Sequence, residues 1–193
     1  MRVKTELPNN YGEIFKVDLA KDKKLSLIIN ILAVIVMILM CALGNLFVPV
    51  TKLFSMEQGF LSYTMRFVVL IVGQFVYIIL HEGVHGIVMK MYGAKNIKFG
   101  LKGPYAFAGC EDYFDKPSYI AVALAPIVVL GIVLLIINLV VSIEWFWVVY
   151  FIQVTNVGGA MGDLYVTCKF VKMPNDILVK DTGVSMTVYS KVK

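Results

Sequence analysis

The chain has 193 residues, of which 59% are hydrophobic and only 16% are charged. Soluble domains carry about a quarter charged residues, so this composition excludes an ordinary water-soluble globular protein and favours membrane spans. The formal net charge of +5 follows from lysines that flank the apolar stretches, and we expect no nucleic-acid partner.

Four apolar stretches are each long enough to cross a membrane as a helix. They run over about residues 25–50, 67–91, 119–141 and 145–171. Each reaches the ~20 residues that a helix needs to cross ~30 Å of hydrocarbon. Because a bilayer offers no partner for free backbone groups, each span should be helical. The sequence therefore predicts an all-α polytopic membrane protein with about four transmembrane helices.

The positive charges predict the orientation of these spans. Of the 18 Lys and Arg residues, only Lys52 and Arg66 lie in the loops after the first and third spans. Positively charged loops stay in the cytoplasm, so both termini are expected there. The chain then divides into a cytoplasmic segment over 1–24, a membrane-embedded domain over 25–171 and a cytoplasmic tail over 172–193. The lipid bilayer is its first expected partner, and the sequence makes no prediction of the oligomeric state.

The second predicted span contains His81-Glu82-Gly83-Val84-His85, which includes both histidines of the protein. Residues four apart lie about one turn apart, so both imidazoles leave the same helix face and can bind one Zn²⁺. Glu82 projects about 100° around the helix, where it suits a general base for a zinc-activated water. The alternative is a set of buried polar residues that hydrogen-bond between helices. Uncompensated charges are costly in a bilayer, which favours the metal interpretation.

A short β-hairpin-like segment is predicted on the cytoplasmic side, between the second and third spans. Residues 96–102 alternate polar or small with apolar side chains, Gly103-Pro104 favours a turn, and residues 105–108 can return as a second strand. The functional interpretation is an edge that accepts an extended peptide. The alternative is an amphipathic loop on the membrane surface. Another short hairpin is predicted around Asp181-Thr182-Gly183, without chemistry of its own.

The fourth predicted span supplies a candidate third ligand. Its polar and small side chains recur at spacings of three and four, and Asp163 is the one carboxylate in this apolar stretch. With the predicted topology, His81, His85 and Asp163 all lie roughly 20–27 Å below the outer surface. The alternative for Asp163 is a helix-end residue that pairs with Lys169 or with water. Three carboxylates after the hairpin are rival ligands: Glu111, Asp112 and Asp115.

Two further features lie in the same span. Asn156 is a candidate hydrogen-bond donor to the metal ligands or to a substrate, with plain helix–helix hydrogen bonding as the alternative. Gly158 and Gly162 form a small-xxx-small pair, which favours close approach of a neighbouring helix.

This arrangement resembles the site-2 protease group of intramembrane zinc metallopeptidases, and more closely the small bacterial putative zincin peptidase family. The resemblance covers about residues 70–167. It rests on His-Glu-x-x-His in one span, a strand-like segment, Ala123-Leu124-Ala125-Pro126 at the start of the next span, and the run from Asn156 to Asp163. Site-2 proteases typically have an Asn-Pro-x-Pro-like run before Asp-Gly, whereas Asp163 lies here between Gly162 and Leu164.

The resemblance implies that His81, His85 and Asp163 bind zinc and that Glu82 is the catalytic base. We therefore expect a zinc metallopeptidase in a prokaryotic cell membrane, with its active site toward the cytoplasm and membrane-anchored proteins or peptides as substrates. One alternative is a non-catalytic metal-binding sensor or regulator, which would not need the glutamate. Another is a transporter, although two histidines on one helix turn form one site rather than a chain of relays.

Overall fold

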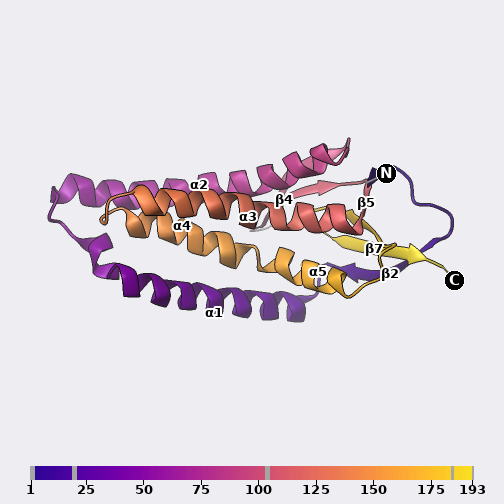
Figure 1. The fold of residues 1–193 in the computed structure, drawn as a ribbon, viewed down its shortest axis with the longest axis horizontal. Coiled ribbons are helices and arrows are strands. Elements are labelled where there is room, and N and C mark those ends of the chain that lie inside the picture. Colours follow the sequence, from indigo (N-terminus) through magenta and orange to yellow (C-terminus); the bar gives the residue numbers. More distant parts are fainter. Residues whose placement is uncertain (1–2, 19–20, 103–104, 184, 193) are drawn as a thin grey trace.

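The computed structural model describes residues 3–18, 21–102, 105–183 and 185–192. The helices are α1 (Lys23–Phe47), the 3₁₀ helix η1 (Val50–Phe54), α2 (Gly59–Met91), α3 (Lys116–Val140), α4 (Phe146–Gly159) and α5 (Met161–Val171). The strands are β1 (Val3–Lys4), β2 (Tyr11–Val17), β3 (Ile97–Lys102), β4 (Tyr105–Cys110), β5 (Tyr113–Asp115), β6 (Leu178–Asp181) and β7 (Met186–Lys191). The helices lie lengthwise beside one another, and the strands gather at one end (Figure 1).

Among the described residues, three helices are long and apolar enough to cross a membrane: α1, α2 and α3. Their large apolar side chains are widely exposed, as shown by Leu46 at 79%, Ile79 at 72% and Leu139 at 76%. Apolar surface of this extent is typical of helices that face lipid and is unfavourable in water. These helices are compatible with a membrane protein.

The prediction of an all-α fold with about four transmembrane helices is wrong. In the described part of the chain, five strands form one sheet and two more form the β3–β4 hairpin. The predicted fourth span is divided at Ala160 into α4, of 14 residues, and α5, of 11 residues, and each is shorter than the ~20 residues of a span. The preceding pair Gly158-Gly159 explains this break, because glycine disfavours helix by about 1 kcal/mol relative to alanine and marks kinks.

The five-stranded sheet joins distant parts of the sequence. Its order is β1-β5-β6-β7-β2, and all neighbours are antiparallel. The register aligns one apolar residue from each strand in a row across the sheet: Val3, Phe114, Val179, Val188 and Phe15. This row belongs to a core that also contains Met89 of α2, Tyr119 of α3 and Phe170 of α5. The sheet therefore holds the ends of three helices together, and both chain termini lie at this end (Figure 1).

Both predicted hairpins are present. Strands β3 and β4 pair from Ile97 opposite Cys110 onward, and the predicted Gly103-Pro104 turn lies outside the described residues. Strands β6 and β7 pair on either side of a turn in which Gly183 has a φ of 76°, a conformation that favours glycine. This turn rests on β4, because a Cβ atom at Gly109 would lie 2.3 Å from the carbonyl carbon of Thr182.

Helix α4 is fixed to α1 along its length. The side chain of Met37 fills the space beside Gly158, where an added Cβ atom would lie 2.3 Å from the methionine Cε. Further along, the Tyr150 hydroxyl donates to the Met40 carbonyl at 2.8 Å, and the Trp147 indole donates to the Val48 carbonyl at 2.9 Å. The close approach predicted for Gly158 is therefore observed.

Candidate metal centre

Two imidazoles and one carboxylate meet between α2 and α5. His81 and His85 lie one turn apart on α2, and each is only 8% exposed. The Asp163 Oδ2 atom of α5 lies 3.6 Å from the Nε2 atom of His81 and 3.6 Å from that of His85. Among the described residues, these three side chains form the group whose ligand atoms all lie within 4.8 Å of one another. The structure thus brings together the three residues that the sequence singles out.

This donor set fits a zinc ion. Tetrahedral zinc with bonds of about 2.0–2.1 Å to nitrogen and oxygen separates its ligand atoms by roughly 3.3 Å, close to the 3.6 Å that joins the Asp163 Oδ2 atom to each imidazole Nε2 atom. Two histidines and one carboxylate are also a ligand set of catalytic zinc sites, in which the fourth position stays open.

The break between α4 and α5 places Asp163 at this point. Because α5 starts at Met161, Asp163 lies in its first turn. Backbone N–H groups at a helix start have no partner within the helix, and the helix dipole there stabilises negative charge. An uninterrupted helix would have placed the same carboxylate in a helix interior, without this stabilisation.

Each histidine is held through its other ring nitrogen. The Nδ1 atom of His85 lies 2.9 Å from the carbonyl oxygen of Val122 on α3, and the Nδ1 atom of His81 lies 2.9 Å from the Tyr77 hydroxyl oxygen. A carbonyl can only accept, so the proton of neutral His85 is on Nδ1 and the lone pair of Nε2 points toward Asp163. Such partners fix the orientation of metal-binding imidazoles.

Tyr77 is one turn before His81 on α2 and is only 6% exposed. With Nε2 of His81 as a metal ligand, Nδ1 carries the proton and donates it to the Tyr77 oxygen. We expect Tyr77→Phe to lower zinc affinity about 10-fold, at the low end of the effect of losing such a partner. Chelator competition on the purified protein measures this affinity. Tyr63→Phe, on the same helix but far from the site, should leave it unchanged.

A cavity of about 260 Å³ opens beside the three candidate ligands. Its lining includes Glu82 of α2, Ala108 of β4 and Tyr119 of α3. Glu82 is half-buried and lines the cavity together with both histidines and Asp163. The arrangement places a carboxylate that is not one of the three ligands beside the candidate metal position, with room for a small group or an extended chain.

A second cavity of about 540 Å³ lies among α1, α2 and α4. Met37 of α1, Ile78 of α2 and Thr155 of α4 are among the residues that line it. It shares His81 and Glu82 with the first cavity. The candidate metal centre is therefore bordered by a space between the helices as well as by the cavity beside the strands.

Among the lining residues of the first cavity that sequence reasoning missed are Tyr119 and Asp181. The Tyr119 hydroxyl donates to Oδ2 of Asp181, and the Gly183 amide donates to Oδ1 at 2.7 Å. Burial raises the pKa of the Asp181 carboxyl above its usual range, and these two hydrogen bonds oppose that shift. Asp181 was placed in a hairpin without chemistry, and only its long-range contact with α3 could have revealed its position.

Asn156 lies elsewhere. It is completely buried, and its amide Nδ2 donates to the carbonyl of Ile127 on α3 at 3.2 Å. Its side chain is absent from the described lining of the first cavity. The structure thus uses Asn156 to join α4 to α3, as the helix–helix alternative predicts.

The rival carboxylates have other partners. Glu111 forms an ion pair with Lys180 at 2.7 Å, which lowers the pKa of Glu111. Asp112 accepts a hydrogen bond from the Lys95 amide at 2.9 Å, and Asp115 accepts one from the Ser118 amide at the start of α3 at 3.0 Å. Lys169 lies over the ring of Tyr165. Among the described carboxylates, Asp163 is the one in the three-residue group with both histidines that could hold a metal ion.

The fold and the site define a class of protein: one with helices of membrane-spanning length and a possible two-histidine, one-carboxylate metal site. A family model described as "Putative zincin peptidase" matches residues 74–178, more than half of the chain. The chain belongs to this family, whose description indicates a zinc metallopeptidase.

One curated relative is similar over part of its length. A Pyrococcus woesei protein described as an uncharacterized 24.7 kDa protein in the gap 5′ region is 30% identical over 119 residues, 56% of this chain and 49% of that protein. The chain thus spans about half the length of this relative. No solved structure matches the chain at a significant level.

Proposed function

We propose that the protein is a membrane-embedded zinc metallopeptidase, similar to site-2 proteases, that hydrolyses peptide bonds of membrane-associated substrates. The observation that carries this proposal is the convergence of His81, His85 and Asp163, with both Nε2 atoms 3.6 Å from one carboxylate oxygen and Glu82 beside them. These residues would hold the ion. Bound Zn²⁺ would supply Lewis-acid chemistry, polarising a carbonyl and making water more acidic.

Glu82 would act as the general base and then as the general acid. Its carboxylate accepts a proton from the attacking water while the water oxygen bonds to the substrate carbonyl carbon. When the C–N bond breaks, Glu82 returns this proton to the leaving nitrogen. A half-buried carboxylate that is not one of the three ligands is free for both transfers.

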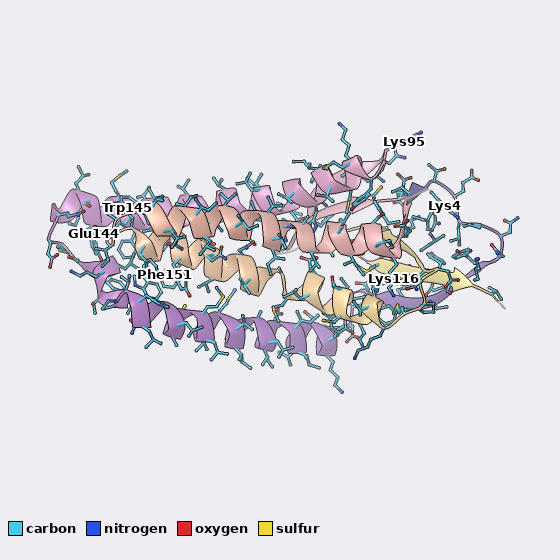
Figure 2. The ribbon with its side chains drawn as sticks, in the orientation of Figure 1. Lys4, Lys95, Lys116, Glu144, Trp145 and Phe151 are labelled. Carbon is cyan, nitrogen blue, oxygen red and sulfur yellow. The ribbon has the colours of Figure 1, made fainter. Side chains whose placement is uncertain are left out.

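The positions of the charges support a cytoplasmic location of the sheet end. Lys4, Lys95 and Lys116 lie at the end with the strands, whereas Glu144 and Trp145 lie at the opposite end (Figure 2). An excess of lysine marks cytoplasmic segments. Because β1 and β2 share a sheet with β6 and β7, both termini would be cytoplasmic, and the site would lie toward that side.

Two features support a membrane-anchored protein or peptide as the substrate. The cavity among α1, α2 and α4 reaches Glu82 from between helices, which suits a substrate that enters from the lipid. Strand β4 borders the first cavity, and its partner in the described two-stranded sheet is β3, so its other edge could bind an extended peptide by main-chain hydrogen bonds. Such an edge would hold the substrate backbone extended, as proteolysis requires.

Cleavage of a membrane-anchored reporter by the protein in lipid vesicles tests the proposal. We expect cleavage that 1,10-phenanthroline abolishes and that stoichiometric Zn²⁺ restores, because the reaction depends on the bound ion. Mg²⁺ should not restore it, since Mg²⁺ prefers six oxygen ligands. Cleavage that persists with the chelator would contradict a zinc-dependent reaction.

A further inference from the structure

Helix α3 contains a proline in its interior, Pro126, which is completely buried. Proline has no backbone N–H, so it cannot donate to the carbonyl four residues earlier. That carbonyl belongs to Val122, and it is the group that lies 2.9 Å from Nδ1 of His85. The proline and the metal ligand are thus linked through one backbone oxygen.

We propose that Pro126 is a positioning residue for the metal centre: it frees the Val122 carbonyl from the helix so that this carbonyl holds the His85 imidazole. This inference rests on the proposed metal centre and adds the device that orients one of its ligands. It also gives a physical role to the Ala123-Leu124-Ala125-Pro126 run, whose proline the proposed mechanism does not use.

The energetics favour this pairing. Val122 is only 1% exposed, and a buried carbonyl without a partner costs about 1–3 kcal/mol. With no N–H at position 126, the side chain of His85 supplies the missing donor. The proline ring also crowds the carbonyl of residue i−4 and turns it away from the helix axis, which makes it accessible to a group on α2.

The consequence is a fixed tautomer. Because the Val122 oxygen can only accept, His85 must carry its proton on Nδ1, and the Nε2 lone pair is left for the ion. His81 has no such constraint, since the Tyr77 hydroxyl can donate or accept. The two histidines therefore differ. The Val122 carbonyl of α3 fixes the tautomer of His85 in advance, whereas the tautomer of His81 is fixed when the ion binds.

Two substitutions that restore the N–H test this role, Pro126→Ala and Pro126→Val. Both let residue 126 donate to the Val122 carbonyl, while one side chain is smaller and the other larger than proline. An effect common to both identifies the N–H rather than the side-chain volume. The control is Pro117→Ala, at the exposed start of the same helix, where a missing N–H breaks no helical hydrogen bond.

Two measurements are made on each variant. Nitrogen-15 NMR of the imidazoles in the metal-free protein reports the tautomer, at a pH above the titration of both rings, where each is neutral. The presence of only two histidines simplifies assignment. Chelator competition reports zinc affinity. We expect wild type and Pro117→Ala to hold His85 with its proton on Nδ1. Both Pro126 variants should show a mixture of tautomers and about 10-fold weaker zinc binding.

The inference is overturned if wild-type His85 carries its proton on Nε2, or if either Pro126 variant keeps the wild-type tautomer. A loss of zinc affinity with an unchanged tautomer would likewise overturn it, because the proline would then act only on packing. A wild-type protein that binds no zinc would refute the proposed function. The tautomer comparison in the metal-free protein would still decide the role of Pro126.

Discussion

Replacement of Asp163 by alanine should leave the purified protein almost free of zinc. The variant keeps His81 and His85 but loses the oxygen that lies 3.6 Å from both Nε2 atoms. Loss of an outer partner of a ligand costs about 10–100-fold in metal affinity, so loss of a ligand should cost at least about 100-fold. His81→Ala should have the same effect, because two remaining ligands cannot close a zinc site.

Metal analysis of the detergent-purified variants measures this loss. Asp176→Ala is the matched control, because Asp176 accepts a hydrogen bond from Ser190 in the C-terminal hairpin. This variant should keep its zinc. Near-stoichiometric zinc in the wild type and in Asp163→Ala together would exclude Asp163 as a ligand. It would direct attention to another carboxylate of the same cavity, such as Asp181.

Glu82→Gln should retain zinc and lose catalysis. Glutamine has nearly the shape of glutamate but cannot accept the proton of the attacking water, and a positioned base contributes about 10²–10⁴-fold to the rate. We therefore expect kcat for the reporter to fall by at least about 100-fold, with the zinc content of the wild type. Glu57→Gln, with a largely exposed side chain in the turn before α2, serves as the control.

The same variant separates a peptidase from a metal-binding sensor or regulator. A sensor needs the three ligands but makes no use of a base, so its metal-dependent response should survive Glu82→Gln. Full cleavage activity in Glu82→Gln, with bound zinc, would contradict the proposed mechanism and leave the metal site intact. The two variants thus test the site and the chemistry independently.

The sequence predicted the candidate ligands because they lie within local patterns. His81 and His85 share one turn of an apolar helix, and Asp163 is the one carboxylate of its apolar stretch. These signals depend on the spacing of residues along one helix, which can be read directly from the sequence. The structure brings these three residues together although the sequence predicted one continuous helix, because the break at Ala160 comes before Asp163 and turns only a short segment.

The sheet could not be predicted in the same way. Strand β5 has three residues and β1 has two, too few for an alternating pattern. Strand β2 contains a register shift between Glu13 and Phe15, which interrupts the alternation that marks a strand. Their stability comes from partners far away in the sequence, such as Phe114 opposite Val179, and a single sequence does not display such pairs.

The order of the strands has a consequence for how the protein matures. Strands β6 and β7 occupy inner positions of the sheet, and β7 joins β6 to β2 from the other end of the chain. During synthesis, β2 must wait until residues up to Lys191 emerge from the ribosome, because its partner is β7. Strand β5 must likewise wait for β6 before the two can pair. A nascent chain would therefore lack the strands around Asp181, and the cavity beside the candidate metal centre would be completed late, after the helices have formed.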